Sequence, residues 1–122
     1  MTELEYLKFM QEHDVALASA NQKISEAIIT YVLFEKEKEQ IISFINNLED
    51  LINAVDLNVP AKYQEAHSLY VEAMKCLKSA INDTESKIKE NDFTSFKEQF
   101  FFYIQKYNNL KNQAQEMIMD LI

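Results

Sequence analysis

The sequence predicts an all-α protein, an antiparallel four-helix bundle made by a single domain over residues 1–122. Apolar residues recur at spacings of three and four nearly throughout the chain, which is the period of a helix. The chain contains no Gly and one Pro, so it lacks the residues on which the many tight turns of a β-rich fold depend. With 122 residues, 48% of them hydrophobic, it can bury one core but not two.

The first predicted helix ends before the charged residues 35–39. Asp14 and Asn21 interrupt its apolar stripe, and such polar insertions set the register of packed helices or meet a partner. A second stripe runs beside the first, and it is either part of a broad buried face or a second contact surface. The first stripe consists of Leu7, Met10, Leu17, Ile24, Ile28 and Tyr31, and the second of Tyr6, Phe9, His13 and Ala16.

The second predicted helix has its apolar stripe between Ile41 and Val55. We expect a break between Phe34 and Gln40, because residues 35–39 read Glu-Lys-Glu-Lys-Glu and offer no core side chain. Helices longer than about 25 residues without caps are also uncommon in compact domains. The alternative is one long helix, which would turn the chain into a long-helix hairpin and an obligate dimer.

Residues 56–60 read as a connector to the third helix. Pro60 fits the first turn of that helix, where its missing N–H costs nothing. The third stripe runs from Tyr63 to Ile88 and ends at the polar residues 89–92. Asn91 or Asp92 is the expected N-cap of the fourth helix, whose stripe runs from Phe93 to Leu121.

Charge restricts the class of partner. The formal net charge is −8, and every basic residue is Lys. A negative field repels nucleic acid and anionic lipid, and without Arg the chain lacks the planar fork that reads guanine and clamps phosphate. Because the acidic residues alternate with Lys, they form no continuous acidic stripe that would mimic DNA. We therefore expect no nucleic-acid partner.

The residues that carry chemistry do not form a catalytic pattern. A carboxylate-bridged di-metal site needs Glu three residues before His, but Met10 precedes His13 and Gln64 precedes His67 at that spacing. Cys76 is the only cysteine, and no His lies within one helical turn of it. Phosphate-binding loops require Gly. We expect no enzymatic activity, no cofactor and no metal site.

Aromatic residues supply the candidate contact surface. Phe100 to Tyr103 are four consecutive aromatics, and at about 100° per residue they spread around most of a helix. They cannot all face one core, and exposed aromatic rings are common at the centre of protein interfaces. The alternative is a last helix that is covered on more than one side. The contact residues that we predict are Phe101, Phe102, Tyr6 and Phe9.

The first residues, Met1 to Glu5, contain no basic segment followed by an apolar one, and no apolar run approaches the roughly 18 residues of a membrane span. As written, the chain is expected in the cytoplasm, without membrane insertion. The alternative is an extracellular domain of a surface protein that has been recloned behind a new Met.

The segment from Leu57 to Ala73 resembles a pattern in uncharacterised small four-helix domains of low-GC Gram-positive bacteria. In that pattern Val59-Pro60 opens a helix, Tyr63 and His67 follow, and the helix continues into an Ala-rich face. Many of these proteins are lipid-anchored at the cell surface, whereas this chain has no lipobox cysteine. The family has no established activity, so the resemblance implies a four-helix fold and a non-catalytic module.

We therefore expect a non-enzymatic module for protein–protein interaction, such as an inhibitor, an antitoxin or a chaperone-like small helical protein of a Gram-positive bacterium or phage. Its partner is expected to be another protein, with a homodimer as the alternative. An extracytoplasmic, envelope-associated or ligand-sensing helical domain is the second hypothesis. A metal-binding bundle is the third.

Overall fold

The computed structural model describes residues 1–34, 38–90 and 96–122, and their side chains except those of residues 32–34, 38, 96–99 and 101. It contains the helices α1 (Glu3–Phe34), α2 (Lys38–Asn53), α3 (Gln64–Lys89) and α4 (Phe96–Leu121), and the short 3-10 helix η1 (Ala61–Tyr63). The described residues form no strand. The all-α prediction is therefore confirmed.

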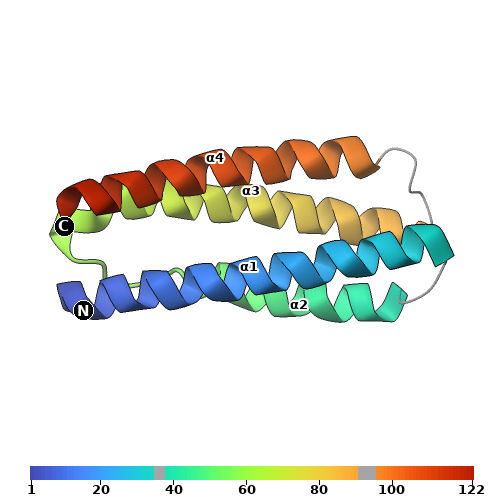
Figure 1. Cartoon of the computed structure of the whole chain (residues 1–122), viewed down its shortest axis with the longest axis horizontal. Helices are drawn as coiled ribbons and strands as arrows, with labels where there is room; N and C mark the ends of the chain where they lie inside the picture. Colours follow the sequence, from blue (N-terminus) through green and yellow to red (C-terminus); the bar gives the residue numbers. More distant parts are fainter. Residues whose placement is uncertain (35–37, 91–95) are drawn as a thin grey trace.

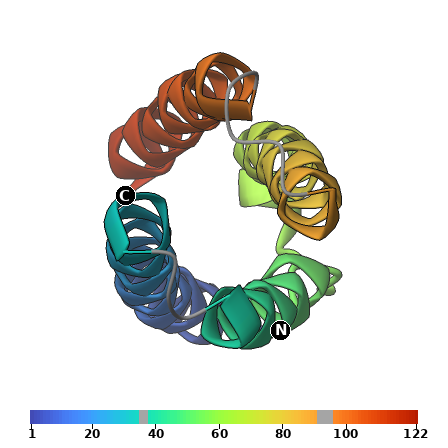
Figure 2. The same ribbon diagram turned by 90° about the vertical axis from the view of Figure 1, so that its right-hand side faces the viewer.

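The four long helices lie side by side, and the chain reverses direction from each helix to the next (Figure 1). Both termini lie at the same end. Seen end-on, the helices follow one another around a ring in the order α1, α2, α3, α4, which places α4 next to α1 (Figure 2). None of the described helices is long and apolar enough to cross a membrane.

The break that separates α1 from α2 lies within the predicted interval. α1 ends at Phe34 and α2 begins at Lys38, and the two helices pack against each other. The alternative of a single long helix across residues 35–39 is therefore wrong. Because the chain folds back after α1, the apolar stripe that begins at Ile41 is buried against α1. In a continuous helix the same stripe could be buried only against a second chain.

The start of α3 differs from the prediction. Pro60 does not occupy the first turn of α3, because it precedes the 3-10 turn η1 with φ −54° and ψ 140°. The N–H of Tyr63 donates to the carbonyl of Pro60 at 2.9 Å and closes that turn. α3 then begins at Gln64. The predicted N-caps of α4, Asn91 and Asp92, lie outside the described residues.

The core is built from the predicted stripes and runs along the whole length of the helices. Ala66, Ala73 and Ala80 recur every seven residues on α3 and are fully buried. Because the distance between two helix axes depends on the side chains at the contact, these small residues favour the extensive contact between α3 and α4. The large fully buried aliphatic side chains belong to Leu17, Ile41, Ile45, Leu48, Met74, Leu77, Ile81 and Ile88.

The neighbouring helices α1 and α4 are separated more widely than the other neighbours. Within the described residues, no Cα atom of α1 lies within 8 Å of a Cα atom of α4, whereas α1 contacts α2, α2 contacts α3 and α3 contacts α4 at that distance. We call this boundary the α1–α4 seam. Its width leaves room for the hollows described below.

Candidate functional site

Two reciprocal hydrogen bonds join α1 to α3 inside the core. The hydroxyl of Tyr6 on α1 lies 3.0 Å from Nδ1 of His67 on α3, and Nδ1 of His13 on α1 lies 2.5 Å from the hydroxyl of Tyr70 on α3. All four side chains are buried. Each helix thus contributes one Tyr and one His, and each residue pairs with the opposite type on the other helix.

The other ring nitrogen of each histidine binds the carboxyl-terminal end of α2. Nε2 of His13 lies 2.6 Å from the carbonyl of Leu51, and Nε2 of His67 lies 2.8 Å from the carbonyl of Val55. A carbonyl only accepts, so each Nε2 carries the proton and each Nδ1 accepts from tyrosine. The carbonyl of Leu51 lies in the last turn of α2 and also accepts from the N–H of Ala54 at 3.2 Å, whereas Val55 lies two residues beyond the end of α2. The two histidines therefore bind the chain where α2 ends.

Burial favours the neutral forms of His13, Tyr6 and Tyr70. Removal from water lowers the pKa of His13 below its usual 6.5, and the hydrogen bond to Leu51 opposes this effect only in part. Burial raises the pKa of Tyr6 to about 12 and raises the pKa of Tyr70 as well. Two buried Tyr–His pairs give the core a hydrogen-bonding specificity that apolar side chains cannot supply.

An ion pair bridges the α1–α4 seam beside these pairs. Nζ of Lys111 on α4 lies 3.4 Å from Oδ1 of Asp14 on α1. That oxygen is buried, and the contact does not have the geometry of a hydrogen bond. Lys111 also lies over the ring of Tyr107, 5.5 Å from its centroid. Asp14, which interrupts the apolar stripe of α1, therefore faces α4 across the seam and pairs with it.

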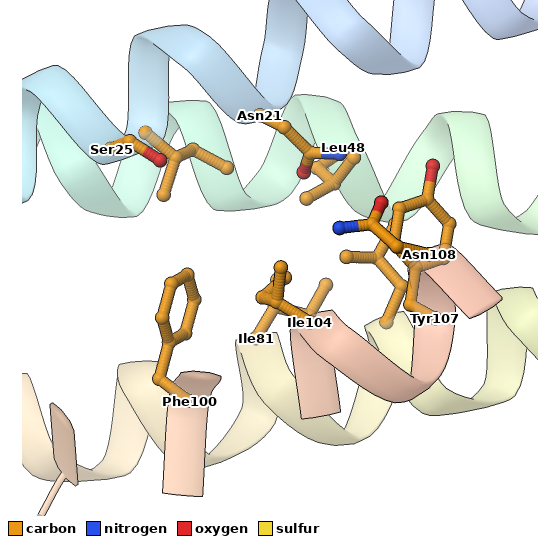
Figure 3. A pocket seen from close by; sticks show the side chains of 10 residues that line it. Asn21, Ser25, Leu48, Ile81, Phe100, Ile104, Tyr107 and Asn108 are labelled. Atoms are coloured by element: carbon orange, nitrogen blue, oxygen red, sulfur yellow. The ribbon is translucent and has the colours of Figure 1, made fainter. Parts of the chain in front are cut away.

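A cavity of about 160 Å³ lies on one side of this bridge, and all four helices line it. Its walls are mostly apolar, whereas the polar side chains come from α1 and α4. Figure 3 shows the amides of Asn21 and Asn108 and the hydroxyl of Tyr107 toward one end, with the ring of Phe100 at the other. The lining residues are Asn21, Ile24, Ser25, Leu48, Leu77, Ile81, Phe100, Ile104, Tyr107 and Asn108.

Tyr107 is the polar residue of this cavity that is most deeply buried, with 2% of its surface exposed. No described residue meets its hydroxyl with full hydrogen-bond geometry. Burial raises the pKa of Tyr107, the negative charge of Asp14 adds to the rise, and a weak hydrogen bond with the side chain of Asn21 opposes it. A buried hydroxyl that is poorly paired is costly. It is also a group to which an incoming molecule can bind.

A groove of about 510 Å³ occupies the seam on the other side of the bridge, near the two termini. Leu7, Met10 and Ile118 lie within it, and the exposed side chains of Val15 and Met119 stand at its edges. We call this feature the terminal groove. The terminal groove was not predicted from the sequence. Val15 and Met119 are apolar residues outside the predicted core stripes, and this position was the available sign of a second apolar surface.

The four predicted contact residues have different outcomes. Phe102 is exposed over 63% of its surface, as the prediction requires. Phe9 is only half-buried, and its ring stacks on that of His13 with the centroids 5.2 Å apart. Tyr6 is fully buried and its hydroxyl binds His67, so it is not available as a contact residue and belongs to the alternative, a broad buried face. The side chain of Phe101 lies outside the described part of the structure.

Both ring nitrogens of His67 are occupied, one by the hydroxyl of Tyr6 and the other by the carbonyl of Val55. Within the described residues, no group of three His, Cys, Asp or Glu side chains lies close enough to hold a metal ion. Cys76 is half-buried and carries a free thiol. Tyr63, which belongs to the segment with the family resemblance, donates from its hydroxyl to Glu3 at 2.6 Å and so attaches η1 to α1.

Comparison with known proteins finds no match to a family model, to a curated protein or to a solved structure.

Proposed function

We propose that this chain is a non-enzymatic protein-interaction module, an antiparallel four-helix bundle that binds an amphipathic helix of another protein in the terminal groove. One observation carries the proposal: an open apolar groove of about 510 Å³ with exposed apolar edges. Val15 is exposed over 65% and Met119 over 71% of its surface. Exposed apolar patches beside polar surface are typical of interaction sites.

The shape of the groove favours a helix as the occupant. The helices α1 and α4 bound it, lying side by side and running in opposite directions, and their backbones stay apart along the seam. An amphipathic helix that inserts its apolar face between two such walls buries side chains at positions i, i+3, i+4 and i+7. The floor residues Leu7, Met10 and Ile118 would meet that face.

The charges beside the groove favour a basic partner. Glu12 precedes Val15 by three residues and Glu116 precedes Met119 by three, so each exposed apolar side chain has an exposed glutamate next to it on its helix. The chain as a whole carries a formal charge of −8. Complementary charge speeds association and selects among partners. The proposed occupant therefore carries Lys or Arg on both sides of its apolar face.

A pair of synthetic peptides tests this proposal. The first has Leu at positions i, i+3, i+4 and i+7 with Lys on both flanks, and the second has the same composition in a scrambled order. Fluorescence anisotropy with labelled peptides would measure their dissociation constants. We expect the first peptide to bind at least tenfold more tightly, because only its Leu residues share one face.

Two matched variants locate the binding surface. The double substitution Val15→Ser and Met119→Ser changes exposed residues and should leave the fold intact, yet it should weaken peptide binding about tenfold or more. Phe102→Ser, which removes an exposed apolar ring outside the groove, should leave binding unchanged. If Phe102→Ser weakens binding and the double variant does not, the surface is the aromatic face of α4 and the groove proposal is wrong.

Light scattering supplies the remaining control. If the native chain is a dimer and the Val15→Ser, Met119→Ser variant is a folded monomer, a second copy of the chain occupies the groove, and the helix of a different protein is excluded as its resident partner. Equal binding of the ordered and scrambled peptides would also contradict the proposal, because attraction by charge alone would then account for it.

A further inference from the structure

We propose that the cavity between the four helices binds a small, uncharged aromatic molecule that carries one hydrogen-bonding group. This site lies on the opposite side of the Asp14–Lys111 bridge from the terminal groove. The inference is independent of the protein partner proposed above.

The size and walls of the cavity fit a single ring. Its volume is about 160 Å³, and an apolar cavity of about 150 Å³ lined by Leu, Ile and Phe is large enough to bind benzene. Leu48, Leu77 and Ile81 are buried side chains that line this cavity. Figure 3 shows Ile81, Ile104 and the ring of Phe100 directed toward the same space. The apolar walls therefore accommodate the ring of the ligand.

Tyr107 is the reason why we expect the ligand to carry a hydrogen-bonding group. Its hydroxyl is buried, and no described residue meets it with full hydrogen-bond geometry. The amides of Asn21 and Asn108 lie toward the same end (Figure 3), and the side chain of Asn21 is close enough to lower the pKa of Tyr107 as a weak hydrogen-bond partner. A hydroxyl on the ligand would give Tyr107 a well-aligned partner, and a buried polar group that is poorly paired costs stability.

The lining also excludes charged ligands. None of the ten lining residues is Asp, Glu, Lys or His, and burial of an ion without a counter-ion is very unfavourable. The polar residues Ser25 and Asn108 are exposed as well as lining the cavity. They lie on α1 and α4, so the seam is the side from which a ligand enters.

Phenol and toluene form a matched pair of probes, because they have the same number of non-hydrogen atoms and differ in the hydroxyl. Titration of each into the ¹⁵N-labelled full chain, followed by NMR, reports both affinity and position. We expect phenol to bind about fivefold more tightly than toluene, as one net hydrogen bond would give. The largest shifts should belong to residues that line the cavity.

Two variants keep the test decisive. Tyr107→Phe preserves the ring and removes the hydroxyl, so it should remove the preference for phenol while toluene still binds. Ile104→Phe should fill the cavity with a larger side chain and weaken the binding of both phenol and toluene. Thermal unfolding and the NMR spectrum recorded without probe establish whether each variant is folded. If Ile104→Phe does not fold, the variant Ser25→Phe, at the exposed edge of the cavity, is used in its place.

The contrary results are equally clear. Shifts confined to surface residues, or no shifts with either probe up to its solubility, would overturn the site. Equal affinity for phenol and toluene in the native chain would overturn the assignment of Tyr107. If water occupies the cavity so firmly that neither probe displaces it, both titrations fail, and the proposal fails with them.

Discussion

The hydroxyl of Tyr70 lies 2.5 Å from Nδ1 of His13 and joins α3 to α1. The same histidine donates from Nε2 to the carbonyl of Leu51 near the end of α2. One buried side chain thus connects three helices. The chain contains no Gly, the residue that commonly ends a helix by adopting a left-handed conformation. At the end of α2 the carbonyl of Leu51 accepts from both the N–H of Ala54 and the ring of His13.

Removal of the Tyr70 hydroxyl should destabilise the protein. Tyr70→Phe leaves Nδ1 of His13 buried without a partner, and we expect a loss of about 1–3 kcal/mol in the free energy of unfolding. Urea denaturation of Tyr70→Phe, His13→Gln and the double variant would give the interaction energy of the pair. The same cycle with Tyr6→Phe and His13→Gln, which are not hydrogen-bonded to each other, should be additive within about 0.5 kcal/mol.

Stability should fall as the pH is lowered from 7 toward 5.5. Burial lowers the folded-state pKa of His13 below the unfolded value of 6.5, so the unfolded chain binds the proton more readily in this range. The stabilisation is present above about pH 6.5 and is lost as the pH falls through the folded-state pKa. Denaturation at several pH values should show this slope, and His13→Gln should flatten it. An unchanged slope would assign the effect to another group.

The Asp14–Lys111 ion pair should contribute modestly to stability. Asp14→Asn removes one charge at the seam, and we expect a loss of at most about 1 kcal/mol, which high salt should reduce. Glu72→Gln is a matched control, since Glu72 pairs with Lys75 within α3 and both side chains are exposed. A salt-insensitive loss at Asp14 would show that packing, not charge, stabilises the seam.

Core and surface aliphatic residues should respond differently to truncation. Leu77 is fully buried, so Leu77→Ala should cost about 2–5 kcal/mol through lost burial and an enlarged cavity. Ile29 lies on α1 with 58% of its surface exposed, and Ile29→Ala should change the free energy of unfolding by about 0.5 kcal/mol or less. Urea denaturation with an unchanged m-value for both variants would make the two free energies comparable. A large loss at Ile29 would mean that its surface is covered in solution.

Part of the candidate site could be predicted from the sequence. Phe102 was selected because four consecutive aromatic residues cannot all face one core, and its side chain is exposed. The pairing of Tyr6 with His67 and of Tyr70 with His13 was not predicted, because a single sequence does not show which faces of two distant helices meet. The signal available was that each helix carries one Tyr and one His within two turns.

Sequence alone determined the helical elements, because a period of three to four in apolar residues depends only on local geometry. The sequence also shows the lack of Gly, the lack of Arg and the excess of acidic residues, from which we predict that nucleic acid is not a partner. The tertiary structure decided which side of each stripe is covered. Tyr6 is buried because His67 meets it, whereas Val15 and Met119 are exposed because α1 and α4 stay apart. Whether an apolar side chain is core or surface depends on what lies opposite, and only the packing of distant segments supplies that neighbour.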